Sequence, residues 1–293
     1  MRIVSFATAA GPGFGLVVGD GIVDAGRRLG GRFPDVRAVL QAGALGELAA
    51  FATAAPDHAL ADVAFLPAVP GEGPGERKIL AVGLNYRAHV AETVGHDVPE
   101  HPRIFARLAD TIIGHGQPMW RPRNSTHFDY EGELAVVIGK PGRHIPTDRA
   151  LAHVAAYTCF NDGSVRDFQK HSVTAGKNFP HTGPLGPWLV TADEIPDPQA
   201  LTLVTRVNGE QRQRTSTADM ILGVAALIAY VSSFTPLEGG DVIATGTPDG
   251  VAQARTPPLW LRPGDVVEVE ISGIGILRNP VVAEPIVAEE NQG

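Results

Sequence analysis

The sequence predicts a β-rich α+β protein with a small domain in front of a larger one. The 293 residues include 34 glycines and 24 prolines, about a fifth of the chain against a usual share of roughly 12%. That composition is typical of many turns and short strands, and it argues against a helical bundle. Apolar residues come in short runs joined by hairpin signals, with few helical segments between them. This pattern favours a mixed or antiparallel sheet over a doubly wound parallel one.

The N-terminal part begins with strands and continues with a helix. Residues 3–24 contain short apolar runs, and Gly19-Asp20-Gly21 between two of them predicts a hairpin. Residues 34–53 place apolar side chains close to one helical face, so we expect a single helix there. The run 67–75 is rich in proline and glycine and has no periodicity, which is typical of a linker.

Division at this linker gives a small N-terminal α/β domain, residues 1–70, and a main domain, residues 71–293. In the main domain, short apolar runs predict strands, and Asn208-Gly209 between two runs predicts a second hairpin. The expected strands lie at 79–82, 134–138, 157–160, 201–207, 241–245 and 266–271. Helices are expected at 86–93 and from Ser216 or Thr217 to Phe234, where Pro236 ends the second one.

Composition and charge exclude several classes of protein. The net charge is −8 and lysines and arginines form no run, which argues against a nucleic-acid partner. Cys159 is the single cysteine, so a disulfide scaffold and a cysteine zinc site are excluded. The apolar run after Arg2 ends at Gly11, too early for a signal peptide, and the longest apolar stretch, 220–234, is too short for a membrane span. We expect a cytoplasmic protein with a small-molecule partner.

Two glutamates lie at the head of a very apolar predicted strand. Glu131 and Glu133 are two residues apart, so an extended chain sends both side chains to the same face. Two carboxylates on one face repel each other unless a cation lies between them or one is protonated. The pair therefore indicates either a solvated strand face or part of a metal site.

A third carboxylate follows another apolar strand. Asp162 comes directly after the predicted strand 157–160, where functional groups often project. Together with the two glutamates it would make an all-oxygen site, which suits Mg²⁺, Mn²⁺ or Ca²⁺ rather than zinc. The alternative for Asp162-Gly163 is a turn or a helix cap.

Three further segments carry candidate chemistry. His89 and Glu92 are spaced i, i+3 on a predicted helix, where a carboxylate can orient an imidazole as a general base or simply form a surface ion pair. Lys177 is one of only four lysines and lies in a Gly/Pro-rich stretch, where it can stabilise an anion or be a solvated surface residue. The loop 244–251 offers backbone N–H groups and hydroxyls to an anion, or is a tight turn.

Together these segments resemble the fumarylacetoacetate hydrolase family from about residue 79 to the C-terminus. The first 70 residues resemble the small, variable domain that bacterial members often carry. The order and spacing of the matching runs carry the resemblance: GLNYRAHVAE (83–92), DYEGELAVVIGK (129–140), FNDGSVRDFQ (160–169), GKNFPHTGPLGPWLV (176–190), TGTPDGV (245–251) and LRPGDVVEVEISGIGILRNPV (261–281).

The resemblance implies a mixed β-roll, usually in a homodimer, and a divalent metal, Mg²⁺ or Mn²⁺. By motif, the metal ligands are Glu131, Glu133 and Asp162. The general-base pair is His89 and Glu92, on a segment that acts as a lid in many members, and Lys177 is the lysine near the metal. Pocket residues matched in the same way are Arg166, Gln169 and Thr247, of which Thr247 is expected to meet a substrate carboxylate.

One segment departs from the family pattern. Many decarboxylase and acylpyruvase members carry a Leu-Lys-Pro run, whereas this chain has residues 105–109, with Arg107 in place of that lysine. A planar guanidinium with several N–H donors thereby replaces the compact ammonium group of a lysine. This difference puts a simple preference for acylpyruvate or oxaloacetate substrates in doubt. We expect Arg107 and His115 to belong to the substrate site of this variant.

The reading that these residues favour is a metal-dependent hydrolase that cleaves a C–C bond in an acylpyruvate-like intermediate of aromatic or sugar-acid breakdown. The alternatives at the same site are a β-keto acid decarboxylase of the oxaloacetate type and a hydroxymuconate-type isomerase. A binding or regulatory protein on an enzyme fold is the remaining alternative. The complete set of three carboxylates, the His89–Glu92 pair and Lys177 argues against it, because a site that has lost its catalytic function need not keep every catalytic residue.

Overall fold

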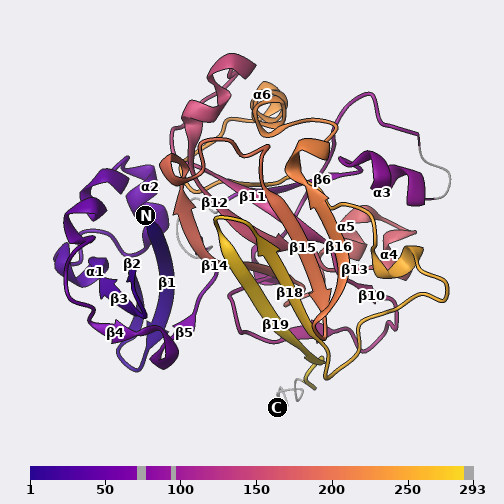
Figure 1. The fold of residues 1–293 in the computed structure, drawn as a ribbon, viewed down its shortest axis with the longest axis horizontal. Coiled ribbons are helices and arrows are strands. Elements are labelled where there is room, and N and C mark those ends of the chain that lie inside the picture. The colour runs from indigo at the N-terminus through magenta and orange to yellow at the C-terminus, as the bar shows by residue number, and fades with distance from the viewer. Residues whose placement is uncertain (71–76, 94–96, 287–293) are drawn as a thin grey trace, which may run out of the picture.

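The computed structural model describes residues 1–70, 77–93 and 97–286. Residues 71–75 of the predicted linker and residues 94–96 of the predicted lid, which spans residues 93–102, lie outside the described residues. Figure 1 shows the N-terminal part at the left and the larger body at the right, with β1 and β14 where the two meet. The fold is β-rich with few helices, which confirms the predicted class.

One large sheet runs through both parts of the chain. Within the described residues it has twelve strands, and β1 pairs with β14 where the N-terminal strands meet the main body. Most neighbours are antiparallel, but β17 runs parallel to β6. The path is β4 (His58–Ala59), β3 (Gly21–Asp24), β2 (Gly11–Val18), β1 (Arg2–Thr8), β14 (Gly183–Thr191), β12 (Val154–Asn161), β11 (Gly132–Ile138), β17 (Val242–Ala244), β6 (Ile79–Gly83) and β7 (Arg103–Ala106), with β5 (Ala64–Phe65) on β1 and β8 (Ile112–Ile113) on β14.

Two smaller sheets and a few helices complete the described structure. The five-stranded sheet has the order β16 (Glu210–Ser216), β15 (Thr202–Val207), β18 (Val266–Ile271), β19 (Gly275–Ala283) and β9 (Met119–Arg121). A two-stranded sheet joins β10 (Phe128–Asp129) to β13 (Ser164–Val165). The helices are α1 (Ala25–Arg28), α2 (Val36–Gln41), α3 (Arg87–Glu92), α4 (Arg166–Gln169), α5 (Val173–Lys177) and α6 (Val224–Phe234).

Both predicted hairpins form, and their turns explain why. In the first, β2 and β3 pair with Val18 opposite Gly21. In the second, Asn208 and Gly209 join β15 to β16 with φ angles of 55° and 77°. Positive φ at both central residues is what a two-residue hairpin turn of the right twist needs.

The single helix expected at 34–53 is wrong. The helix α2 ends at Gln41, and a separate 3-10 segment covers Leu45–Phe51. The break falls at Gly43, which adopts a φ of +63° that only glycine enters freely. The apolar spacing continued across this glycine, so periodicity alone did not reveal the interruption.

The second predicted helix is also shorter than expected. Ser216 does act as a cap, because its side chain and that of Asp219 form a capping box. That box starts only the short 3-10 turn Thr217–Asp219, and α6 begins later, after Gly223. The end of α6 at Phe234, two residues before Pro236, is confirmed.

The strand β11 lies at the centre of the core. Every residue from Gly132 to Ile138 is buried, so both faces of the strand are covered. Leu134, Val136 and Ile138 pack in one hydrophobic cluster, and Ala135 and Val137 pack in another on the opposite face. A strand buried on both faces leaves no solvated face for the glutamates at its head, which removes that alternative.

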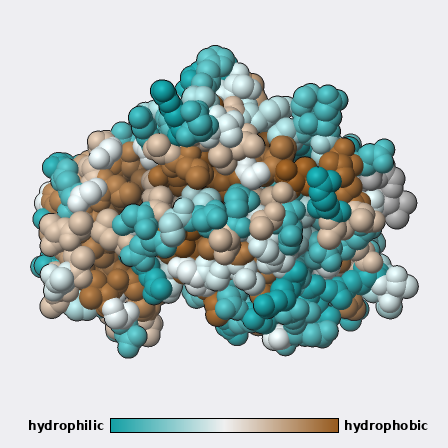
Figure 2. Space-filling view, turned by 45° about the horizontal axis from the view of Figure 1, so that its top comes forward, coloured by the Kyte–Doolittle hydropathy of each residue, from teal (hydrophilic) through white to brown (hydrophobic). Residues whose placement is uncertain are grey.

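The surface is mixed in polarity. Figure 2 shows apolar residues over the N-terminal part at the left and in a band across the upper middle, and mainly polar residues at the lower right. Among the described residues, exposed large apolar side chains include Leu108, Val173 and Phe234. No described helix is both long enough and apolar enough to cross a membrane.

Candidate active site

Three buried carboxylates meet at the ends of two central strands. Glu131 directly precedes β11, Glu133 lies within it, and Asp162 directly follows its antiparallel partner β12. The backbone locks them together, since the Asp162 amide donates to the Glu131 carbonyl at 2.8 Å. One oxygen from each carboxylate lies within 4.8 Å of one from each of the others. The structure therefore brings together the three residues that the sequence predicted as metal ligands.

Three buried cations, Lys177, Arg166 and Arg107, form ion pairs with this triad. The Lys177 ammonium bridges two members, at 2.5 Å from Glu131 Oε2 and 2.6 Å from Asp162 Oδ2. Arg166 donates to Glu131 Oε1 at 2.6 Å and to Asp129 Oδ2 at 2.8 Å. Lys177 is only 2% exposed, so it is not the solvated surface lysine that its loop also allowed.

The surrounding charges shift the pKa values of the two glutamates in opposite directions. Burial alone would raise the pKa of Glu131, but Lys177, Arg166 and His89 outweigh it and lower that pKa to about 2. Burial and the neighbouring carboxylates of Asp162 and Glu131 raise the pKa of Glu133 well above its usual range. Among the described residues, Glu133 is the triad member without an ion pair to lysine or arginine, and it accepts a hydrogen bond from the Gly246 amide at 2.9 Å. The site thus has excess negative charge at Glu133, which a bound cation would relieve.

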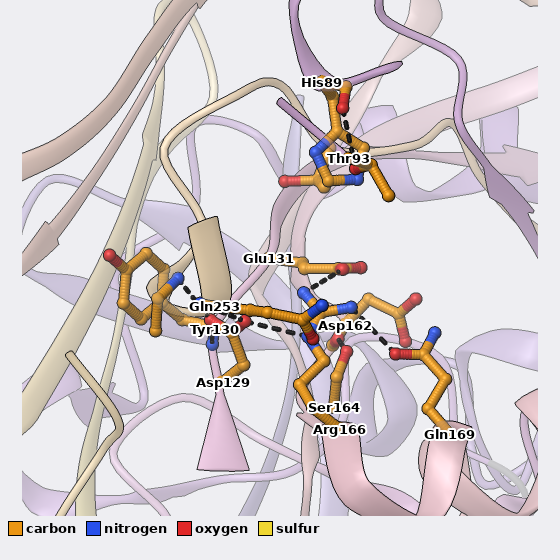
Figure 3. Close-up of polar contacts among 12 residues, drawn as sticks. His89, Thr93, Asp129, Tyr130, Glu131, Asp162, Ser164, Arg166, Gln169 and Gln253 are labelled. Atoms are coloured by element: carbon orange, nitrogen blue, oxygen red, sulfur yellow. Dashed lines mark hydrogen bonds and ion pairs between the residues drawn. The ribbon is translucent and has the colours of Figure 1, made fainter. Parts of the chain in front are cut away.

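The predicted base pair lies across from the triad. His89 Nδ1 is 2.7 Å from Glu92 Oε1, and the other oxygen of Glu92 accepts from the Gly250 amide at 2.8 Å. His89 is 7% exposed, so the pair is not a surface ion pair. Figure 3 shows His89 on one side of an open space, with Glu131, Asp162 and Arg166 on the other.

The substrate-binding residues predicted by motif lie in different environments. Gln169 accepts from Arg166 Nη1 at 2.9 Å and so lies beside the triad, as Figure 3 shows. Thr247 donates to the Gly132 carbonyl at 3.0 Å and accepts from Gln213 at 2.9 Å, so its hydroxyl is tied to the metal-ligand strand.

Arg107 and His115 are both engaged by other groups of the protein. The Arg107 guanidinium is fully buried and pairs with Asp162 Oδ1, the Gly163 carbonyl and Thr182 Oγ1. It therefore helps to hold Asp162, a candidate metal ligand, in place. His115 accepts from the Arg278 amide at 3.1 Å, and its ring lies against Phe65 with centroids 4.9 Å apart. A substrate contact for either residue stays a prediction.

Two residues that support the site were missed in the sequence. Asp129 is fully buried and accepts from Arg166 and from the amides of Ala252 and Gln253. Gln213, on β16, accepts from the Gly132 amide at 3.0 Å and donates to Thr247 and to the Pro248 carbonyl. Asp129 stood next to the glutamates and could have been noticed. Gln213 lies in a polar hairpin strand and carried no signal.

A family model described as the C-terminal part of fumarylacetoacetate (FAA) hydrolase matches residues 78–282. The chain belongs to the fumarylacetoacetate hydrolase family. This confirms the family that the sequence motifs predicted, and the match begins just after the N-terminal part.

Several named enzymes of this family are similar to this chain in sequence or in structure. Oxaloacetate tautomerase YisK of Bacillus subtilis is 44% identical over 209 residues, which cover 70% of this chain and 69% of the relative. The 2,4-didehydro-3-deoxy-L-rhamnonate hydrolase of a Sphingomonas strain is 42% identical over 231 residues, 75% of this chain and 81% of the relative. The maleylpyruvate hydrolase of Sphingobium sp. SYK-6, crystallised with Mn²⁺ and pyruvate, aligns with a TM-score of 0.80 and 28% identity over 97% of this chain and 100% of that one. The chain is therefore an enzyme of a family that contains hydrolases and isomerases.

The donor set of this fumarylacetoacetate hydrolase family member fits a divalent metal. Its candidate ligands are all carboxylate oxygens, which hard cations such as Mg²⁺ and Mn²⁺ prefer. The uncompensated carboxylate of Glu133 provides the negative charge that such an ion would neutralise. The manganese in the Sphingobium hydrolase is consistent with this donor set.

Proposed function

We propose that this enzyme is a metal-dependent hydrolase that cleaves a C–C bond in an acylpyruvate-like 2-oxo acid. The observation that carries the proposal is the placement of the buried triad Glu131, Glu133 and Asp162 opposite the His89–Glu92 pair. One side of this space suits an oxygen-chelating substrate, and the other provides a base. Hydrolysis of a 1,3-dicarbonyl compound needs both.

The three carboxylates would hold Mg²⁺ or Mn²⁺. When bound, the metal supplies Lewis acidity to a substrate carbonyl and stabilises negative charge on the enolate that C–C cleavage leaves. The Lys177 ammonium, held at 2.5–2.6 Å from two of the carboxylates, adds a fixed positive charge at the same place.

The remaining residues have distinct roles in this proposal. Glu92 fixes the His89 ring through Nδ1, which leaves Nε2 to accept a proton from a water molecule. The water oxygen attacks the distal carbonyl, the C–C bond breaks, and its electron pair goes to the enolate, which the proton then quenches. Arg166, Gln169 and Thr247 are proposed to bind polar groups of the substrate.

A second candidate is tautomerisation of a 2-oxo acid at the same site. This reaction needs the enolate and a proton shuttle but no attack by water. The observation that favours it is the 44% identity to oxaloacetate tautomerase YisK. His89 would then move the proton between carbon and solvent.

Product analysis distinguishes the two. We would incubate the protein with Mg²⁺ or Mn²⁺ and acetylpyruvate, longer acylpyruvates or oxaloacetate, with a chelator control. Pyruvate plus a free carboxylic acid, lost on chelation, is the expected result. A change in the enol absorbance at constant mass would indicate tautomerisation instead of hydrolysis. Carbon dioxide without a second acid would indicate decarboxylation.

A matched pair of variants checks the site itself. Glu131→Ala should lose both bound metal and turnover. Glu210→Ala, which changes an exposed glutamate on β16, should keep both. Unchanged turnover in Glu131→Ala would refute the site assignment.

A further inference from the structure

The carboxylate of Glu92 is held from two sides. Its Oε1 lies 2.7 Å from His89 Nδ1, and its Oε2 accepts from the Gly250 amide at 2.8 Å. The first contact links it to the proposed base. The second fixes the rotation of the carboxylate, because a carboxylate anchored at only one oxygen can still turn about its terminal torsion. The orientation of His89 therefore depends on where Gly250 lies.

Gly250 is itself fixed by its surroundings. Its φ is +96°, and a Cβ added there would lie 2.2 Å from the Arg212 carbonyl oxygen, so only glycine fits. Its carbonyl accepts from the Tyr130 hydroxyl at 3.0 Å, and from Arg255 Nη2 at 3.3 Å. Arg255 also donates to the Arg212 carbonyl at 2.7 Å, so its head group is shared between the two. The shorter contact to Gly250 is the one from Tyr130.

Tyr130 connects this loop to the metal-ligand segment. It lies between Asp129, which pairs with Arg166, and Glu131, a triad member. Its ring is 1% exposed and packs in a cluster with Phe128 and Val165. That packing accounts for the burial of the ring but not for a hydroxyl aimed at the Gly250 carbonyl. In Figure 3 the ring points away from Glu131, so the hydroxyl does not itself face the open space.

We propose that the Tyr130 hydroxyl is a positioning group for the His89–Glu92 pair, acting through Gly250. This inference rests on the proposed role of the pair as general base. One backbone segment then sets both halves of the site: Glu131 would be one of the residues that hold the metal, and the neighbouring Tyr130 holds the loop that orients the base. Alignment of base and metal within a fraction of an ångström is what such a reaction requires.

A double-mutant cycle tests the proposal. Tyr130→Phe removes only the hydroxyl, and loss of one such hydrogen bond corresponds to about a fivefold drop in kcat. We expect this drop with acetylpyruvate or oxaloacetate as the probe and Mn²⁺ as the metal, with KM and Mn²⁺ affinity unchanged. In a Glu92→Gln background, Tyr130→Phe should cause no further loss, because its route to the base is already broken. Tyr157→Phe, which changes another buried tyrosine on β12, should keep the wild-type rate.

Hydrogen–deuterium exchange provides a readout that needs no substrate. The peptide spanning residues 246–252 should exchange about fivefold faster in Tyr130→Phe than in the wild type or Tyr157→Phe. The proposal that Tyr130 acts through Gly250 would be overturned by unchanged exchange in Tyr130→Phe. It would also be overturned if the losses in kcat of the two single variants multiply in the double variant. Full turnover in Glu92→Gln would instead refute the base role of the pair, and faster exchange in Tyr130→Phe would still show the link to Gly250. The two failures are therefore distinguishable.

Discussion

Replacement of Arg107 by methionine tests whether this residue supports the site or binds substrate. The sequence predicts a substrate contact, whereas the structure places the guanidinium in a buried ion pair with Asp162. Both side chains of this ion pair are fully buried. The same guanidinium satisfies the Gly163 carbonyl at 3.1 Å and Thr182 Oγ1 at 2.8 Å. Methionine fills a similar volume but leaves these groups without their donor.

The expected loss follows from these contacts. Breaking a buried ion pair by removal of one partner costs about 3–5 kcal/mol of unfolding free energy. Lys177 still pairs with Asp162 Oδ2 at 2.6 Å in the variant, so we expect the lower end of that range. For a chain of this size, about 3 kcal/mol corresponds to a fall in Tm of roughly 6–12 °C. The Tm of Arg107→Lys should lie between those of the wild type and Arg107→Met, because lysine keeps the positive charge but lacks the several N–H donors of the planar guanidinium.

Thermal unfolding of the metal-free proteins, followed by steady-state kinetics, provides the assay. Arg149→Met, which changes an exposed arginine, serves as the control and should keep the wild-type Tm. If Arg107→Met also keeps the wild-type Tm and instead raises KM tenfold or more, the guanidinium contacts substrate and the structural argument is wrong.

Three further predictions concern the charged cluster and its support. A saturating divalent metal at 100 times its Kd should stabilise the wild type by about 2.7 kcal/mol, and Glu131→Ala should lose this shift in a melting experiment. In the metal-free protein, the raised pKa of Glu133 means that the folded state binds the proton more tightly, so stability should fall as pH rises above the ordinary value of 4.5, by up to ~1.4 kcal/mol per pH unit. Glu133→Gln should flatten that fall between pH 5 and 8, and an unchanged slope would contradict the shift. Gln213→Leu should cost about 1–3 kcal/mol for each buried group that it leaves unpaired, including the Gly132 amide, whereas Gln211→Leu, which changes an exposed residue of β16, should be neutral in urea unfolding.

Local signals in the sequence predicted much of the fold. The Asn208-Gly209 turn, the apolar run of β11 and the end of α6 near Pro236 each depend on neighbouring residues, and each is confirmed. The two helices predicted too long failed for a common reason. The first is interrupted at Gly43, which has a positive φ, and the second at Met220, where the backbone leaves the helical region with a ψ of 137°; apolar periodicity continues across both positions. A glycine inside a segment with helical periodicity can therefore mark the end of a helix and should not be treated only as a tolerated residue within it.

The site was predictable only where its residues lie close together in the chain. Glu131 and Glu133 share a strand end, and His89 and Glu92 share a helix, so spacing was enough to pair them. Gln213 reaches the same place from the five-stranded sheet, 81 residues beyond its Gly132 partner. That contact exists only after β15 and β16 pack onto the core. Arg107 was found by motif, but its burial under Asp162 depends on strand β7 joining the edge of the large sheet.

The balance of charge in the buried cluster limits what the site can bind. Among the described residues, the cluster contains the carboxylates of Asp129, Glu131, Glu133 and Asp162 and the cations of Arg107, Arg166 and Lys177. With every group ionised, the carboxylates exceed the cations by a single charge. A divalent cation at the triad would reverse the sign and leave a single positive charge, which a buried site tolerates poorly unless an anion accompanies it. A 2-oxo carboxylate brings that anion. Burial and the neighbouring carboxylates of Asp162 and Glu131 raise the pKa of Glu133, so the excess negative charge is least compensated at this residue.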